Sequence, residues 1–255
     1  MNPSLIADVV RFELARSLSP GRLSIWVLLT AFPILLIGVV RWVIGTEDPE
    51  RLGIMLYVLV PQVTCILGLL LWGTPAISTE LEGQTWIYLA MRRSGRSMVL
   101  VGKYLTAVLW TLSSAFVSIT ACCLLMGSAS SIETWAAMCI LAVLSCVVHG
   151  ALYVLIGVIF FRRTMVAAVG YTLAFEVGLG NIPAVINKVL ISYRLRGILA
   201  DWTGWDIRSS GELMYGVDPT STHLIVLITM AAGLLVASLF WLRFAEYPTQ
   251  QDGSA

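Results

Sequence analysis

The chain has 255 residues, of which 58% are hydrophobic and only 12% are charged. Soluble domains carry roughly 25% charged residues, so this composition excludes an ordinary soluble fold. The net charge of +1 gives no reason to expect a nucleic-acid partner, and the position of each charge therefore matters more than the total.

The first predicted element is an amphipathic helix over residues 4–18, with Ser4 as its N-cap. Glu13 and Arg16 interrupt its apolar side, so the helix is only moderately amphipathic. Such a helix is typical of a segment that lies along the membrane surface rather than across it.

Long apolar runs then follow along the chain, each near the roughly 20 residues that a helix needs to cross the hydrocarbon core. One of them is interrupted by a single acidic residue, Glu176. The predicted spans are residues 23–44, 54–78, 104–126, 135–161, 164–180 and 222–242. The sequence therefore predicts an all-α integral membrane protein, with an amino-terminal interfacial helix followed by six transmembrane helices.

Lys and Arg are concentrated in the connections on one side of these spans, which predicts that this side and both termini are cytoplasmic. The residues concerned are Arg11, Arg16, Arg22, Arg92, Arg93, Arg96, Lys103, Arg162, Arg163 and Arg243. On this topology residues 1–245 form one transmembrane domain, 181–221 form an outer segment, and 246–255 form a flexible cytoplasmic tail.

The outer segment begins where the fifth span should break, because Gly178, Gly180 and Pro183 follow one another within the apolar run. Residues 184–199 are expected to form a short re-entrant or interfacial helix after this break. No stretch outside the membrane is long enough for a folded domain.

Motifs for metal or nucleotide binding are missing from the sequence. The five cysteines all lie in apolar stretches, with no C-x-x-C pair and no histidine at ligand spacing. No G-x-x-x-x-G-K-[ST] loop occurs either. We therefore expect no metal and no cofactor on this chain, and no ATP hydrolysis by it alone.

The most specific local signal is the connection over residues 80–103, between the second and third spans. Glu80 and Glu82 come first, an apolar helical stretch follows, and a basic cluster with Arg93 completes it. An apolar ridge between opposite charges suits docking against another protein. A solvated loop that obeys the positive-inside rule is the alternative interpretation.

This connection resembles the coupling region of type-2 permeases of ATP-binding-cassette (ABC) transporters. In that family an acidic residue, a Gly and a Thr lead into a short helix, followed by an Arg-containing turn and a Lys that opens the third span. The matching residues are Glu80, Glu82, Gly83, Thr85, Leu89, Arg96 and Lys103. The family usually has a Pro in the turn, where this chain has Ser94 and Gly95.

The resemblance implies a non-catalytic permease subunit, working as an exporter in the inner (plasma) membrane of a bacterial cell. It implies a second permease copy, identical or related, and two cytoplasmic ATPase subunits that bind the ATP and Mg. Those subunits would contact the coupling region and the turn at Arg162 and Arg163. Two alternatives stay open: a non-transporting assembly subunit, and an intramembrane enzyme that uses His149 and Glu176.

His149 and Glu176 are polar residues inside predicted spans, where such residues are costly and therefore candidates for function. They stand thirteen residues to either side of the Arg162–Arg163 turn, so they should share one depth and be near neighbours, with a hydrogen bond between them. They could form a structural hydrogen bond, line a substrate path, or take part in proton coupling or catalysis. Gln62 in the second span is a further candidate for the path.

The fifth span also carries a stripe of small residues, since Gly170, Ala174 and Gly178 recur every four residues. Such a stripe allows a neighbouring helix to pack closely. Small residues are also simply common in membrane helices, which is the alternative. In the resembled family the second and fifth spans line the pathway and the dimer interface.

Overall fold

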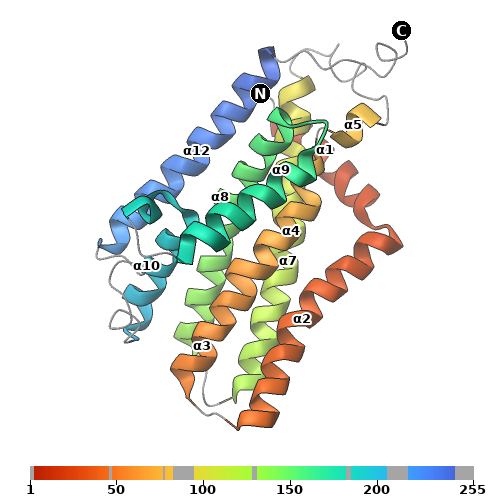
Figure 1. Ribbon diagram of the computed structural model, residues 1–255. Helices are drawn as coiled ribbons and strands as arrows, with labels where there is room; N and C mark the ends of the chain where they lie inside the picture. Colours follow the sequence, from red (N-terminus) through yellow and green to blue (C-terminus); the bar gives the residue numbers. More distant parts are fainter. Residues whose placement is uncertain are drawn as a thin grey trace.

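The computed structural model describes residues 3–45, 48–76, 78–82, 95–127, 131–181, 185–205 and 218–244. Within these ranges the regular elements are helices and no strand occurs. The long helices pack side by side into one bundle (Figure 1). Since all predicted elements were helical, the all-α part of the prediction is confirmed.

The amino-terminal helix α1 (Pro3–Ser17) crosses the first turns of α7 (Gly95–Met126). A side chain at Gly102 would collide with Val9, so the missing Cβ at this position is what lets α1 lie so close. Helix α2 (Pro20–Ile44) begins directly afterwards, where the Ser19 hydroxyl accepts the backbone N–H of Arg22 as an N-cap. It ends at Gly45, which adopts the left-handed conformation typical of a helix C-terminus.

The second span is one continuous helical stretch, Pro49–Ala76, built from four segments of different pitch. They are α3 (Pro49–Tyr57), the π-helix η1 (Val58–Thr64), α4 (Cys65–Trp72) and the 3-10 turn η2 (Thr74–Ala76). The short helix α5 (Ser78–Glu82) follows at the end where α1 lies (Figure 1).

Helix α8 (Ile132–Ile159) occupies the centre of the bundle and packs against α7, α4 and α10 (Ile191–Thr203), as well as against the last helix, α12 (Thr220–Phe244). In the most apolar 18-residue stretch of α8, 67% of the residues are buried, whereas the buried share of the corresponding stretch is 22% in α2 and 17% in α12. α2 and α12 are therefore the peripheral helices, and they present apolar side chains outward.

Five described helices are long and apolar enough to cross a membrane: Pro20–Val43, Pro49–Ala76, Gly95–Met126, Ile132–Ile159 and Thr220–Phe244. Each overlaps a predicted span. The remaining predicted span, 164–180, is a shorter apolar helix over Thr164–Gly178. It consists of α9 (Thr164–Tyr171) and the π-helix η4 (Thr172–Gly178), with the 3-10 turn η5 (Leu179–Asn181) after it.

The helix expected near residues 184–199 is present, but most of it is buried in the bundle. It consists of the 3-10 helix η6 (Val185–Val189) and α10, and α10 packs against α8 and α12. Every residue from Ile191 to Ala200 is buried. Gly197 provides the close approach, because a Cβ there would collide with the His223 ring of α12.

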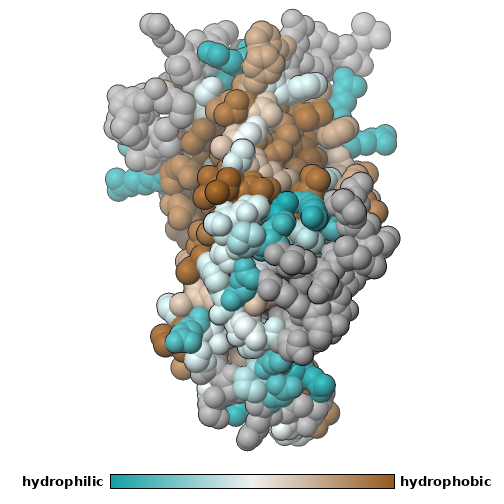
Figure 2. Space-filling view, turned by 90° about the vertical axis from the view of Figure 1, so that its left-hand side faces the viewer, coloured by the Kyte–Doolittle hydropathy of each residue, from teal (hydrophilic) through white to brown (hydrophobic). Residues whose placement is uncertain are grey.

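Large apolar side chains cover much of the outer surface, among them Leu28, Leu35, Ile228 and Phe240 on the two peripheral helices. On the face drawn in Figure 2 the hydrophobic residues form a band over the upper part, with hydrophilic residues above and below it. A surface of this kind needs an apolar surrounding, since soluble monomers rarely expose large contiguous apolar patches. The chain is a helical, multi-pass membrane protein.

Candidate functional site

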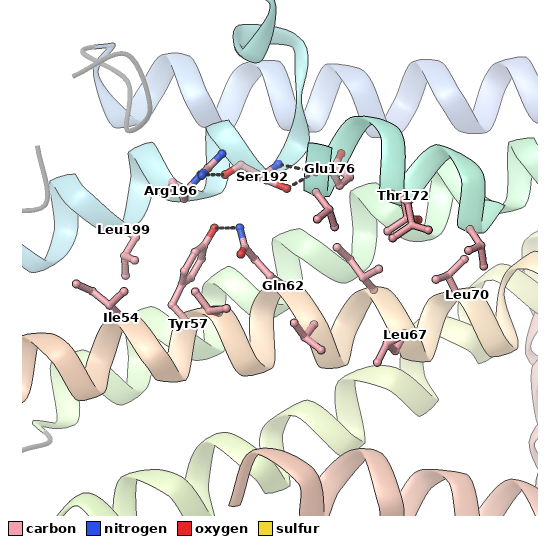
Figure 3. A pocket seen from close by; sticks show the side chains of 16 residues that line it. Ile54, Tyr57, Gln62, Leu67, Leu70, Thr172, Glu176, Ser192, Arg196 and Leu199 are labelled. Carbon is pink, nitrogen blue, oxygen red and sulfur yellow. Dashed lines mark hydrogen bonds between the residues drawn. The ribbon is translucent and has the colours of Figure 1, made fainter. Parts of the chain in front are cut away.

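A groove of about 560 Å³ separates the second span from the short apolar helix Thr164–Gly178, which the sequence predicts as a fifth span, and α10 closes one end of the groove (Figure 3). Its walls are mostly aliphatic. The polar residues in its lining are Tyr57, Gln62, Thr172, Glu176, Ser192 and Arg196. A cavity of ~300–1,000 Å³ with apolar walls and a few convergent polar groups is the usual form of a small-molecule site.

Both walls of this groove contain a π-helical segment, η1 in the second span and η4 in the fifth. Wider turns of this kind are rare and are frequently found at functional sites. η1 contains Pro61, which has no N–H to donate to the helix, and the Pro61 carbonyl accepts the Ser145 hydroxyl of α8 at 2.6 Å. η4 contains Glu176, which it places on the buried side of the Thr164–Gly178 helix.

Glu176 and His149 are near neighbours, as the sequence predicts. The Nε2 atom of His149 lies 3.8 Å from Oε2 of Glu176, and the two side chains are only 0% and 1% exposed. The predicted direct hydrogen bond is not formed, because hydrogen bonds of this kind span ~2.7–3.2 Å. Oε2 instead accepts the backbone N–H of Ser192 at 3.2 Å and also the Ser192 hydroxyl.

The other ring nitrogen of His149 faces the backbone of its own helix, α8. Nδ1 lies 3.0 Å from the carbonyl oxygen of Ser145, which can only accept, so Nδ1 carries a hydrogen. In a neutral ring Nε2 is then an acceptor that faces a carboxylate oxygen.

Two buried polar atoms of this pair have no hydrogen-bond partner among the described residues, namely His149 Nε2 and Glu176 Oε1. Orphaned polar atoms are costly in a protein interior, and each one calls for a functional or structural reason. Tyr153 stacks on the His149 ring and binds Thr172 of η4 through its hydroxyl at 2.7 Å. α8 and η4 are thus joined at two neighbouring polar contacts.

Arg196 of α10 lies at the polar end of the groove. Its Nη2 donates to the Gly180 carbonyl at 2.5 Å and its Nε to the Ser192 carbonyl at 3.3 Å. Gln62 lies on the opposite wall and donates through Nε2 to the Tyr57 hydroxyl at 3.3 Å (Figure 3). The structure thus brings Gln62 and Glu176 to one groove, with His149 directly behind Glu176.

Ser192 and Arg196 were not among the predicted site residues, although both lie in the stretch 184–199 that was expected to be helical. The spacing of Ile191, Leu195, Ile198 and Leu199 is the signal that could have revealed them. These residues repeat with a helical period, which predicts an amphipathic helix with an apolar side to bury.

At the other end of the molecule, Glu80 forms a buried ion pair with Lys103. Oε1 of Glu80 lies 2.5 Å from the Lys103 ammonium, which also donates to the Thr79 hydroxyl at 3.2 Å. Glu13 of α1 adds a second carboxylate 3.9 Å from the same ammonium. This contact explains why an acidic residue interrupts the apolar side of α1.

The remaining coupling candidates divide into two groups. Gly83, Thr85, Leu89 and Arg93, together with the side chain of Glu82, lie outside the described residues. Arg96 is half-buried in the first turn of α7, whereas Arg162 and Arg163 are exposed in the turn between α8 and α9. That turn lies near η2, since α8 and α9 both pack against it.

The small-residue stripe faces outward. Gly170, Ala174 and Gly178 are exposed, and a Cβ at Gly170 would meet nothing within 4 Å among the described residues. No helix of the described chain packs on the stripe, so its role in helix packing stays a prediction that concerns another chain.

No model of a known protein family matches the sequence, and no curated protein is significantly similar to it. Among the residues that the structure describes, no three His, Cys, Asp or Glu side chains gather where they could hold a metal ion. The features of this chain that bear on function are therefore the groove, the buried ion pair and the sequence of residues 80–103.

Proposed function

We propose that this chain is the permease subunit of an ABC transporter of the type-2 class, and that a separate cytoplasmic ATPase supplies the energy. One observation carries the proposal: the buried Glu80–Lys103 ion pair joins the two ends of the segment that resembles a coupling region. Because the pair clamps the base of this segment, a movement imposed on it by a docked partner would pass to the helices that hold it.

Three parts of the bundle meet at this clamp. Lys103 belongs to α7, Glu80 follows the second span directly, and Glu13 belongs to α1. Interiors are close-packed and transmit displacement rather than absorbing it. A partner that pulls or pushes on residues 80–103 would therefore act on the second span, which forms one wall of the groove.

In this proposal the chain has six spans with both termini in the cytoplasm, and α9 with η4 and η5 is the fifth span. Its apolar part, Thr164–Gly178, would cover about 22 Å at ~1.5 Å per residue, less than the ~30 Å of the hydrocarbon core. The buried helix α10 fills the space beyond its outer end. Irregular backbone at membrane depth is tolerated where it is buried in protein in this way.

The groove between the second and fifth spans would form one half of the substrate path. Gln62, Glu176 and Arg196 supply polar contacts in an otherwise aliphatic wall. A second permease copy would face the exposed Gly170–Gly178 side of the fifth span, and the complex would export its substrate across the inner membrane of a bacterial cell.

The proposal is tested by photo-crosslinking in cells. A photoreactive residue at Arg163, exposed in the α8–α9 turn, should capture a protein that contains a G-x-x-x-x-G-K-[ST] loop. The matched control is Glu133, which is also exposed and lies in the first turn of α8, at the opposite end of the same helix. The ATPase activity of the purified complex should then be lower when Glu80 is replaced in the variant Glu80→Gln. Capture at Glu133 instead, or capture of no nucleotide-binding protein, would refute the proposal.

A further inference from the structure

Arg196 is a buried cation with no acidic partner among the described residues. Only 9% of it is exposed, and its guanidinium binds two carbonyl oxygens, those of Gly180 and Ser192. Its neighbour Arg194, two residues earlier on α10, pairs with Asp218 at 3.1 Å. A buried charge is costly unless it is compensated, so the positive charge of Arg196 is available to a ligand in the groove that it lines.

The acidic residue of the groove does not cancel this charge by direct contact. The Glu176 side chain is only 1% exposed, and its Oε2 is turned toward Ser192 and His149. Figure 3 shows Arg196 and Tyr57 extending from opposite walls at the same end, with Gln62 beside them. The polar end of the groove therefore holds the Arg196 cation and neutral polar groups, together with the Glu176 carboxylate, whose Oε2 is engaged by Ser192.

The rest of the groove suits an apolar chain. Val58 and Leu67 on the second span and Leu173 on the fifth are 41%, 41% and 60% exposed along its opening. The volume of about 560 Å³ is that of a site for a molecule of drug size, which is enough for a headgroup and part of an acyl chain. A ligand that satisfies both regions has an anionic head and an apolar tail.

We propose that this groove binds an anionic lipid of the surrounding bilayer, with its phosphate at Arg196 and an acyl chain along the second and fifth spans. Arginine suits this role because its planar, permanently charged guanidinium matches the geometry of a phosphate. The site would work whether or not the chain is a transporter, so this inference does not depend on the proposed function.

The test compares two lipids with identical acyl chains, phosphatidylglycerol and phosphatidylcholine, by native mass spectrometry of the purified chain in detergent. Both lipids carry a phosphate, but the trimethylammonium group of phosphatidylcholine neutralises its headgroup, so the net negative charge of phosphatidylglycerol should make it bind about tenfold or more tightly. Arg196→Gln should remove this preference. The control variants Arg194→Gln and Arg163→Gln, which remove a paired cation and a surface cation, should keep it.

A second variant, Leu67→Trp, keeps the test decisive if Arg196→Gln does not fold. Its larger side chain fills the groove from the exposed rim and should weaken the binding of both lipids. An unchanged preference in Arg196→Gln, unchanged binding in Leu67→Trp, or loss of the preference in Arg163→Gln would each overturn the proposal. Oleate binding that needs Arg196, without phosphatidylglycerol binding, would also overturn it, since the ligand would then be a free fatty acid rather than a bilayer lipid.

Discussion

The buried ion pair between Glu80 and Lys103 allows a quantitative test of how the coupling segment is held. The two charged atoms are 2.5 Å apart, and their side chains are 6% and 9% exposed. At an effective dielectric constant of ~20 the Coulomb attraction at this distance is about 6–7 kcal/mol, before the cost of removing both charges from water. Because that cost is of similar size, the net contribution of the intact pair is small.

Removing one partner has a much larger effect than removing both, because the remaining charge stays buried. Lys103→Gln leaves Glu80 without its partner and Glu13 without its neighbour, and should cost about 3–5 kcal/mol of the free energy of unfolding. Glu80→Gln should cost less, about 2–3 kcal/mol, since Glu13 still lies 3.9 Å from the ammonium. The double variant should be less destabilised than Lys103→Gln alone.

The measurement is a double-mutant cycle, with unfolding followed by near-UV circular dichroism in mixed micelles of a mild detergent and dodecyl sulfate. Arg163→Gln, an exposed cation in a turn, is the matched control and should change stability by no more than ~0.5 kcal/mol. If the two single changes are each that small, or if their costs simply add in the double variant, the two side chains are not coupled and the clamp does not exist.

Three further changes test the helix packing and the groove by thermal unfolding in detergent. Glu176→Leu should destabilise by about 1–3 kcal/mol more than Glu176→Gln, since only glutamine keeps an acceptor for the buried Ser192 N–H; equal losses would contradict this. Ser145→Ala should cost about 1 kcal/mol through the lost bond to the carbonyl in η1, with faster amide exchange in that segment; unchanged exchange would speak against it. Gly157→Ala should lower the stability by about 1–3 kcal/mol, because its Cβ would collide with the Thr74 carbonyl. Gly170→Ala meets open space and should be tolerated. Similar effects at the two glycines would show that the contact between Gly157 and Thr74 is not close.

Most of the fold follows from local sequence, because crossing a membrane requires a run of apolar residues of a minimum length. Five predicted spans overlap helices of the structure, with ends that differ by at most nine residues. The proximity of His149 and Glu176 was predictable for a similar reason. Two antiparallel helices joined by a short turn place residues at equal distance from the turn side by side.

Other features could not be predicted from the sequence because they depend on which residues of distant helices lie next to them. Pro61 predicts an irregularity in its helix. The wider turn of η1, however, is stabilised by the Ser145 hydroxyl of α8, which is far away in sequence. Arg194 and Arg196 look like solvated charges of an outer segment, yet α10 is buried against α8 and α12. The exposed Gly170 stripe looked like a packing surface, but none of the described helices covers it.

The amino-acid sequence alone determined that the chain is helical, that it lies in a membrane, and where each long helix begins and ends to within nine residues, since the bilayer acts on every apolar run separately. Only the tertiary structure decided that Arg196 has no acidic partner among the described residues, that Glu80 holds Lys103, and that the second span and the Thr164–Gly178 helix leave a groove between them. These properties depend on distances between residues that are far apart along the chain, and hydropathy carries no information about such distances.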